Sequence, residues 1–201
     1  HSDVYACRQT GFAMLCETNP QEVMDLSPVA HLATIEGKVP FINFFDGFRT
    51  SHEIQKIEKW DYADLKEMCN MDAVEAFRAH ALNPEHPAMR GSHENGDVFF
   101  QHREACNTAY NELPAIVEKY MAKINEKLGT NYDLFNYYGA EDADRVIVAM
   151  GSVNDVAEEV IDYLTAKGEK VGLIKVRLYR PWVSEAFLKV LPKTAKKVAV
   201  L

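Results

Sequence analysis

The fold is indicated by Val39-Pro-Phe-Ile-Asn-Phe-Phe-Asp-Gly-Phe-Arg-Thr-Ser-His-Glu-Ile-Gln-Lys-Ile57, in which an apolar segment runs directly into a dense polar turn. Residues 40–45 are almost continuously apolar, which predicts a strand buried on both faces, as in parallel α/β sheets. Asp46 ends the strand, and polar residues from Arg49 onward precede an expected helix over 53–59. Ligands of open α/β sheets bind at the carboxyl ends of the strands. Asp46 and Arg49 are therefore candidate ligand contacts, unless Asp46 only caps the helix and Arg49 only pairs with a carboxylate.

The composition is that of a globular protein without fibrous or disordered character. Of the 201 residues, 47% are hydrophobic and 26% are charged, which is ordinary for this class. The net charge of -8 argues against nucleic acids and anionic membranes as partners, because both repel a negative protein. No apolar run approaches the ~20 residues that cross a bilayer, and no basic-then-apolar leader opens the sequence. We therefore expect a cytoplasmic protein without membrane or nucleic-acid partners.

Cysteine and histidine spacing predicts neither disulfides nor a metal site. The four cysteines are scattered and form no C-x-x-C pair: Cys7, Cys16, Cys69 and Cys106. Free thiols are the natural interpretation for a cytosolic chain of this length. Four histidines fall in one stretch near Cys106: His80, His86, His93 and His102. Because their spacing matches no pattern of closely spaced zinc ligands, we assign no metal ligand.

Residues 1–128 predict part of an αβα layer. Asn19 and Pro20 begin an amphipathic helix that ends at Gly37, and the strand described above follows. Further helices are expected at 62–69, at 72–82 with Asp72 as its cap, and at 113–128. The segment 83–111 lacks helical periodicity and contains several turn signals, so an extended arm is expected there.

A second pair of candidate contacts lies near the start of the sequence. Val4 to Cys7 is interpreted as a strand, and the polar residues Arg8 to Gly11 follow it. Polar residues after a strand are candidates for ligand contact, so the segment from Arg8 to Gly11, which includes Thr10, is a candidate. The alternative is that Gly11 only serves a turn.

The sequence from 145 onward predicts the start of a doubly wound domain, after a linker over 129–144. Apolar strands and amphipathic helices alternate there, with strands at 146–150, 171–179 and 197–201 and helices at 153–167 and 184–191. Such a βαβαβ run requires parallel strands with right-handed connections.

Two polar groups in this second part have open interpretations. Ser152 and Asp155 begin a helix, where Ser152 can cap the helix or the backbone can hold an anion; the capping interpretation is favoured because the glycines of a phosphate loop are absent. Arg177 and Arg180 lie near the end of a strand. They can clamp an anion or form an ion pair between domains, and the sequence leaves these alternatives even.

Five motifs resemble pyruvate:ferredoxin (flavodoxin) oxidoreductases, and the resemblance covers essentially the whole chain. The motifs are Arg8-Gln-Thr-Gly-Phe-Ala-Met-Leu15, Gln21-Glu-Val-Met-Asp-Leu26, Phe44-Phe-Asp-Gly-Phe-Arg-Thr-Ser-His-Glu-Ile-Gln-Lys-Ile57, Asn83-Pro-Glu-His-Pro87 and Val171-Gly-Leu-Ile-Lys-Val-Arg-Leu-Tyr-Arg-Pro181. The third motif is highly specific, whereas the shorter ones are weak individually. Members of this family are very large, and the sequence starts without methionine and stops within an expected strand. We therefore expect a piece of a longer enzyme.

The resemblance implies a fold and a reaction for the parent enzyme. The piece would comprise the end of a thiamine pyrimidine-binding domain, 1–128, and the start of a domain like the carboxy-terminal domain of transketolase, 145–201. The family oxidises pyruvate with coenzyme A to acetyl-CoA and CO₂ and reduces ferredoxin or flavodoxin. Thiamine diphosphate, Mg²⁺ and iron–sulfur clusters are the implied cofactors of the parent, which is expected to be a homodimer.

The same resemblance limits what this piece can do alone. The diphosphate and Mg²⁺ sites, the cluster cysteines and the glutamate that activates thiamine lie in parts of the family that have no counterpart here, so no catalytic residue is assigned and no cofactor is expected to bind. The region of Arg8 to Gly11 corresponds in position to an active-site loop of thiamine enzymes, which favours Thr10 and Gly11. Two other hypotheses stand beside this one. The chain could be a structural module that docks other domains, or a separate phosphate-binding α/β protein, which the poor glycine loops disfavour.

Overall fold

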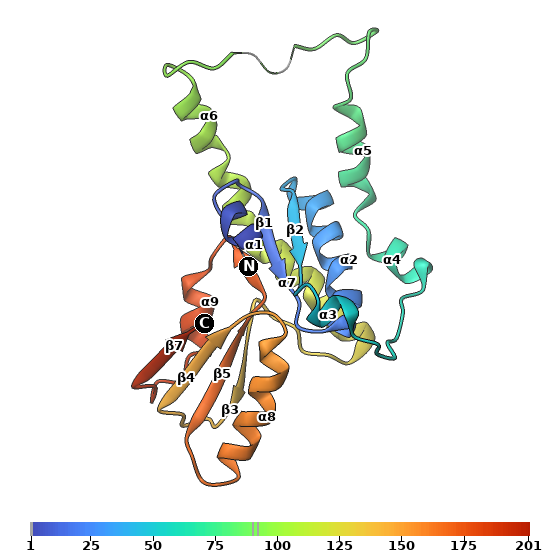
Figure 1. Ribbon diagram of the computed structural model, residues 1–201. Helices are drawn as coiled ribbons and strands as arrows, with labels where there is room; N and C mark the ends of the chain where they lie inside the picture. Colours follow the sequence, from blue (N-terminus) through green and yellow to red (C-terminus); the bar gives the residue numbers. More distant parts are fainter. Residues whose placement is uncertain (1, 90, 92) are drawn as a thin grey trace.

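The chain folds into two β-sheets with flanking helices, and the sheets meet end to end (Figure 1). The computed structural model describes residues 2–89, 91 and 93–201. In this part of the chain, the first sheet has the strand order β2-β1-β6 and the second has the order β3-β5-β4-β7. One cluster of buried apolar side chains includes residues of both sheets. The predicted α/β fold built from pieces of parallel sheet is confirmed.

The first sheet is centred on a short, fully buried strand, β1 (Ala13–Cys16). It pairs in parallel with β2 (Phe41–Phe44) and antiparallel with β6 (Leu178–Arg180). The strand at β2 was predicted correctly. The prediction that both of its faces are buried is wrong, because its residues are half-buried. Among the described strands β2 pairs only with β1, so it lies at the edge of the sheet.

The sequence misassigned the region before β1. The expected strand over Val4 to Cys7 lies instead in a helix, α1 (Ser2–Cys7), which buries none of its residues. Gly11 then turns the chain with a φ of +95°, and the strand follows at β1. A four-residue apolar stretch is too short for its periodicity to distinguish a strand from a helix. The strand β1 is therefore recognised only by its pairing with β2 and β6.

Two long helices pack against each other beside the first sheet: α2 (Pro20–Gly37) and α7 (Asn107–Leu128). The Asn19 side chain accepts a hydrogen bond from the Glu22 nitrogen at 3.0 Å, which caps α2 as its sequence predicts. The helix ends at Gly37, and Lys38 adopts the left-handed conformation with a φ of 56°. The expected boundaries of α2 are confirmed, whereas α7 starts six residues before its expected start at Leu113.

The polar turn after β2 differs from its prediction. A single helical turn, α3 (Arg49–His52), forms there, and the helix expected over 53–59 is absent from this described segment. The Gln21 side chain explains the difference, because its Oε1 accepts from the Glu58 nitrogen at 2.9 Å and its Nε2 donates to the Glu58 oxygen at 3.2 Å. These bonds hold the segment extended along α2.

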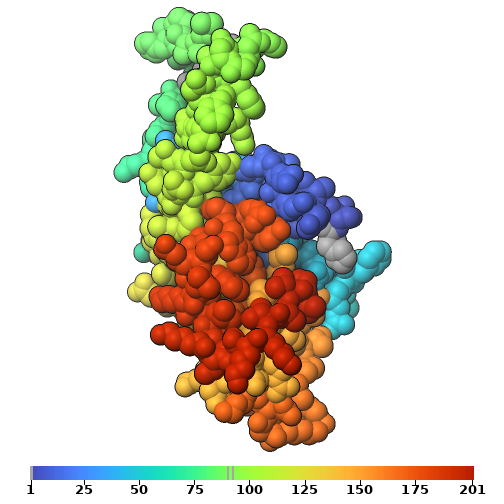
Figure 2. All heavy atoms as spheres, turned by 90° about the vertical axis from the view of Figure 1, so that its left-hand side faces the viewer, coloured from blue at the N-terminus to red at the C-terminus, as the bar shows by residue number. Residues whose placement is uncertain are grey.

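The chain then leaves the body and returns to it through short helices. They are α4 (Tyr62–Met68), α5 (Met71–Ala79) and α6 (Phe99–Ala105). Asn70, rather than the expected Asp72, caps α5 by accepting from the Ala73 nitrogen at 3.1 Å. α5 and α6 stand clear of the sheets (Figures 1 and 2) and bury no residue. α6 lies within the expected extended arm, so that arm is partly helical.

The second sheet has the predicted βαβαβ order with one additional strand. The elements are β3 (Phe135–Gly139), β4 (Arg145–Ala149), α8 (Val153–Thr165), β5 (Val171–Val176), α9 (Ser184–Val190) and β7 (Lys197–Val200). β4 pairs in parallel with β5 and β7, as predicted, whereas β3 pairs antiparallel with β5. β3 lies within the segment that the sequence indicated as a linker.

The strand expected over 171–179 is divided between the two sheets at Arg177. Its first part is β5 in the second sheet, and its second part is β6 in the first sheet. The Arg177 nitrogen donates to the Leu134 oxygen at 3.0 Å, and the Arg177 oxygen accepts from the Cys16 nitrogen at 2.9 Å. Its backbone therefore bonds to the residue before β3 on one side and to the last residue of β1 on the other. A sequence pattern cannot show such pairing.

Candidate functional site at the junction of the two sheets

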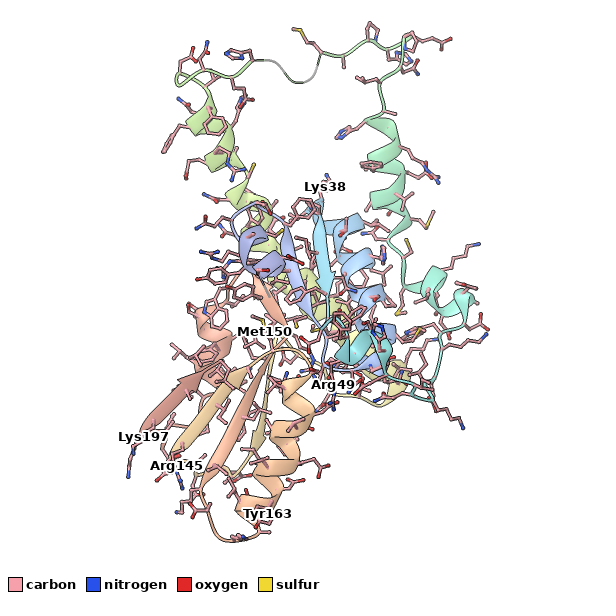
Figure 3. The ribbon with its side chains drawn as sticks, viewed as in Figure 1. Lys38, Arg49, Arg145, Met150, Tyr163 and Lys197 are labelled. Atoms are coloured by element: carbon pink, nitrogen blue, oxygen red, sulfur yellow. The ribbon has the colours of Figure 1, made fainter. Side chains whose placement is uncertain are left out.

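The carboxyl ends of the parallel strands in the two sheets face each other (Figure 3). Lys38 precedes β2 and lies at the far end of the first sheet, and Arg145 begins β4 at the far end of the second. Arg49 and Met150 follow the same two strands and lie toward the meeting point. Open α/β sheets bind ligands outside these strand ends. Here the strand ends of each sheet face those of the other sheet.

Asp46 contacts the start of helix α8 from the opposite sheet. Its Oδ2 accepts a hydrogen bond from the Ser152 backbone nitrogen at 2.5 Å. A carboxylate is favourable at this position because the first backbone N–H groups of a helix are unpaired and carry a partial positive charge. The Ser152 side chain makes no capping bond, so the prediction that Ser152 caps its own helix is wrong. The cap of α8 comes from Asp46 instead.

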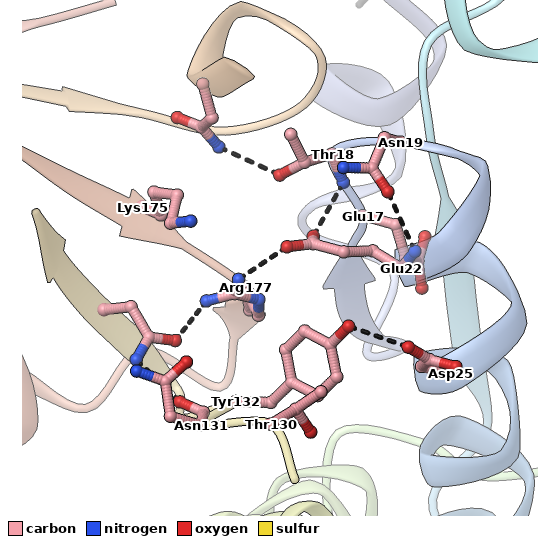
Figure 4. Close-up of polar contacts among 12 residues, drawn as sticks. Glu17, Thr18, Asn19, Glu22, Asp25, Thr130, Asn131, Tyr132, Lys175 and Arg177 are labelled. Atoms are coloured by element: carbon pink, nitrogen blue, oxygen red, sulfur yellow. Dashed lines mark hydrogen bonds and ion pairs between the residues drawn. The ribbon is translucent and has the colours of Figure 1, made fainter. Parts of the chain in front are cut away.

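The central contact of the junction is a buried ion pair between Glu22 and Arg177 (Figure 4). Arg177 Nη2 lies 2.6 Å from Glu22 Oε1, and the Thr18 nitrogen donates to Glu22 Oε2 at 2.9 Å. Arg177 also donates to the side-chain oxygen of Asn136. Burial alone would raise the pKa of Glu22, but the charge and hydrogen bonds of Arg177 outweigh it and hold the pKa below its usual value. Of the two interpretations of Arg177, the geometry favours the ion pair between sheets.

A second set of hydrogen bonds extends this contact into α2. Tyr132 donates its hydroxyl hydrogen to Asp25 Oδ2 at 2.8 Å, and Gln21 Nε2 donates to Asp25 Oδ1 at 2.9 Å. The Arg177 guanidinium lies 5.1 Å from the centre of the Tyr132 ring. Burial raises the pKa of Asp25 despite these donors. The first turns of α2 therefore supply two carboxylates to this region, Glu22 and Asp25.

Glu17 is an unusual group at this junction. Its side chain is fully buried, and neither of its carboxylate oxygens has a hydrogen-bond partner among the described residues. Burial, together with repulsion from Glu22, raises the pKa of Glu17 to about 9. Burial also raises the pKa of the neighbouring Cys16 thiol. At pH 7 both groups are therefore neutral, and Cys16 has no thiolate character for nucleophilic chemistry.

The structure does not bring the four candidate residues from the sequence together. Asp46 and Arg49 follow β2, whereas Thr10 and Gly11 precede the amino end of β1. The Thr10 hydroxyl donates to the Cys7 oxygen at 2.7 Å, and the Tyr110 hydroxyl donates to the Gly11 oxygen at 2.6 Å. The Arg49 side chain is 65% exposed and lies 3.1 Å from Glu53 Oε1. Of the four, only Asp46 takes part in a contact between the sheets.

Sequence reasoning missed the acidic and polar residues that follow β1. Glu17 and Thr18 were not considered because β1 itself was not predicted, and Glu22 was interpreted only as part of a helix start. The available signal was the step from the apolar Ala13–Cys16 stretch to the polar Glu17 to Asn19 segment. That step has the same form as the one at Asp46, and in the structure both lie at the same edge of the first sheet.

The described residues do not fit a Mg²⁺–diphosphate site. Within residues 2–89, 91 and 93–201 there is no group of three histidine, cysteine or carboxylate side chains that could hold a metal ion. The two charged side chains best placed at the junction, Asp46 and Arg177, are already bound to Ser152 and Glu22. No catalytic step through thiamine diphosphate can therefore be derived from this chain.

Comparison with known proteins gives the family. The family described as pyruvate flavodoxin/ferredoxin oxidoreductase, thiamine diP-binding, matches residues 1–122, and the pyruvate:ferredoxin oxidoreductase core domain II matches residues 143–201. The chain belongs to the pyruvate:ferredoxin/flavodoxin oxidoreductase family. The family suggested by the sequence motifs is thus confirmed.

Members of this family match the chain over its whole length. It is 57% identical over 201 residues to the pyruvate-flavodoxin oxidoreductase of Enterobacter agglomerans and to the pyruvate:ferredoxin oxidoreductase of Moorella thermoacetica. It is 50% identical over 202 residues to the pyruvate dehydrogenase [NADP(+)] of Cryptosporidium parvum. Each alignment covers 100% of this chain but only 17%, 17% and 10% of the respective relative. The chain is therefore similar to a small part of these enzymes.

A solved structure shares the fold. The 2-oxoglutarate:ferredoxin oxidoreductase from Magnetococcus marinus matches with a TM-score of 0.54 and 20% identity, over 94% of this chain and 34% of that one. At this identity the match concerns the fold alone. In the part of the chain that the structure describes, no helix is both long and apolar enough to span a membrane.

Proposed function

We propose that this chain is part of a cytoplasmic enzyme that converts pyruvate, coenzyme A and an oxidised ferredoxin or flavodoxin into acetyl-CoA, CO₂ and the reduced carrier. The observation that carries this proposal is the 57% identity to pyruvate-flavodoxin oxidoreductase over every residue of the chain. Thiamine diphosphate, Mg²⁺ and iron–sulfur clusters would be held by residues elsewhere in this enzyme, which we propose is a homodimer. Residues 1–128 and 145–201 would form its adjoining domains, joined through 129–144.

Isothermal titration calorimetry tests whether thiamine diphosphate and Mg²⁺ are bound by other parts of the enzyme rather than by this chain. We expect no heat of binding when thiamine diphosphate and Mg²⁺ are added to the isolated chain, because its described residues offer no metal-binding group. The full-length polypeptide should bind the same mixture and oxidise pyruvate. Micromolar binding to the isolated chain would contradict the proposed fragment role. A natural polypeptide of about the 22.8 kDa of this chain would remove the basis for transferring the family's reaction.

Within that enzyme, we propose that the first-sheet residues at the junction dock the second domain rather than bind a ligand of their own. This role is supported by charged contacts between the two parts, among them those from Asp46 to Ser152 and from Glu22 to Arg177. Thr10, Gly11 and Arg49 remain candidate walls of the thiamine site. Arg49 is the strongest of these three, because its guanidinium is exposed and, among the described residues, its side chain pairs with Glu53 alone.

Replacement of the Asp46 carboxylate separates docking from ligand binding. In the full-length enzyme we expect Asp46→Asn to lower the melting temperature while the KM for pyruvate changes little, because the charge at the start of α8 is lost. Asp142→Asn is a matched control, since the Asp142 carboxylate is exposed and forms an ion pair with Lys170 at 2.5 Å, away from the start of α8. A large rise in KM with an unchanged melting temperature would instead assign Asp46 to the ligand site.

A further inference from the structure

Glu17 lies in the line of contact between the two sheets. The residue before it, Cys16, donates its backbone N–H to the Arg177 oxygen at 2.9 Å. The residue after it, Thr18, accepts a hydrogen bond at Oγ1 from Asn154 Nδ2 at 3.3 Å. Both partners belong to the part of the chain that follows the first sheet's helices. Glu17 is completely buried, and it lies between two residues that both bond to this second part of the chain.

The charges around Glu17 do not compensate an ionised carboxylate. The ionisable groups at the junction are Cys16 on β1, Glu22 on α2, Asp46 after β2, Asp155 and Glu158 on α8, Lys175 on β5 and Arg177 between β5 and β6. Arg177 is bound to Glu22 and Asn136, and the Glu22 carboxylate repels Glu17. An ionised carboxylate without partners in such a site is far less stable than the neutral acid.

We propose that Glu17 is a proton-binding group that couples protonation to the docking of the two sheets, being neutral when they are docked and ionised when they separate. Closing the junction then takes up one proton, and opening releases it. Glu17 thereby makes the contact between the two domains sensitive to pH. This inference rests on the geometry of the chain and holds independently of the reaction proposed for the parent enzyme.

The direction of the pH dependence follows from proton counting. In the open state Glu17 is solvated and has a pKa near its ordinary value of about 4.5, whereas burial raises the pKa of the docked state to about 9. Between these values the docked state holds one more proton than the open state. Raising the pH therefore favours opening, by up to about tenfold per pH unit, until the docked state also ionises near pH 9.

The chain contains its own reporter of opening. Cys16 is 3% exposed and adjoins Glu17, whereas Cys106 is exposed on the arm between α6 and α7. In the full-length polypeptide, the rates at which a thiol reagent modifies the two cysteines are measured by peptide mass spectrometry. The ratio of the Cys16 rate to the Cys106 rate removes the general increase in thiol reactivity with pH. This ratio should rise several-fold per unit between pH 6 and pH 8.

Glu17→Gln tests whether ionisation of Glu17 causes the pH dependence, because glutamine has the shape of the neutral acid and cannot ionise. We expect the ratio of labelling rates to lose its pH dependence in this variant. Glu169→Gln is the control, since Glu169 is an exposed glutamate at the opposite end of the second sheet, bound to Arg145, and should retain the wild-type dependence. The same pH dependence in Glu17→Gln as in the wild type would overturn the proposal.

An infrared measurement keeps the proposal testable if Glu17→Gln does not fold. The wild-type protein should show the carbonyl band of a protonated carboxylic acid at pH 7, which persists until the pH approaches 9. Labelling of glutamate with ¹³C should shift this band, which would assign it to a glutamate rather than an aspartate. Absence of a protonated glutamate at pH 7 would show that Glu17 is ionised in the docked state and would refute the inference.

Discussion

Asp46 and Ser152 are 106 positions apart, yet the Asp46 carboxylate accepts a hydrogen bond from the Ser152 backbone nitrogen at 2.5 Å. One residue follows the edge strand β2 of the first sheet, and the other begins helix α8 of the second. A helix N-terminus is an anion-binding position because its first N–H groups are unpaired. In this chain the anion comes from the neighbouring sheet. The contact therefore aligns the two sheets and satisfies the helix at the same time.

Gly151→Ala should weaken this contact. Gly151 has a φ of +82°, and a Cβ atom there would lie 3.0 Å from Asp46 Oδ1 and 3.1 Å from Oδ2, so the carboxylate would have to move. We expect a loss of about 2–3 kcal/mol, of which ~1 kcal/mol is the backbone cost of alanine in this conformation. Gly168→Ala is the control, because its φ is +87° and, apart from its chain neighbours, the described residues place no atom within 4 Å of the added Cβ. Equal losses in urea unfolding would show that Asp46 contributes nothing.

Glu22 and Arg177 should be strongly coupled. Both side chains are buried, so Glu22→Gln or Arg177→Met leaves its partner uncompensated and should each cost about 3–5 kcal/mol of unfolding free energy. The double variant should lose much less than the sum of the two. Arg145→Met removes an exposed pair with Glu169 and should cost less than ~1 kcal/mol. Strict additivity in the Glu22 and Arg177 cycle, measured by denaturant unfolding, would contradict a direct interaction.

Glu36 should make the protein less stable in acid. Burial would raise its pKa, but hydrogen bonds from Lys119, Tyr120 and Asn70 outweigh it and lower the pKa to about 2. The ionised form therefore stabilises the fold fully above the unfolded pKa of about 4.5, and this contribution is lost as the pH falls toward 2. Because Lys119 is partly exposed, we expect only about 1–3 kcal/mol.

Urea unfolding of Glu36→Gln at pH 7 and pH 3 measures this contribution. The variant should be less stable than the wild type at pH 7. The difference should shrink at pH 3, because Glu36 is then protonated in most unfolded molecules and the folded state has to hold the charge against that proton. If Glu36 were solvated, the two proteins would respond equally to the change of pH.

Much of the architecture could be predicted because its periodic segments are long. The helix α2 has a capping Asn19, a proline at its first position and a left-handed residue after its last turn, so local chemistry sets both ends. The regular alternation after Arg145 likewise predicts the order of the second sheet. In contrast, β1 has only four residues. Its identity as the central strand depends on partners more than 25 and 160 positions away in the sequence, which no local pattern contains.

The candidate site was only partly predictable for a related reason. The step from apolar to polar residues at Asp46 correctly indicated a strand end, but the sequence could not show that the start of α8 occupies it. Arg177 was open between an anion clamp and an ion pair, because its partner Glu22 is 155 positions away. The sequence thus identifies which residues are polar at a strand end, whereas only the fold decides whether a ligand or another part of the chain pairs with them.

Arg49→Ala should reduce pyruvate turnover of the full-length enzyme more than it reduces stability. The Arg49 side chain is 65% exposed and pairs with Glu53 within one helical turn, so its structural contribution should be below ~1 kcal/mol. If its guanidinium binds an anionic group of the substrate or cofactor, its loss should lower kcat/KM by about tenfold or more, the equivalent of a charged hydrogen bond of at least ~1.5 kcal/mol. Arg78→Ala is a matched control, because Arg78 is 66% exposed and pairs with Glu75 in the same way on α5. An unchanged kcat/KM with a lowered melting temperature would show that Arg49 is a structural residue, whereas a similar loss of activity in both variants would indicate a general effect of surface charge.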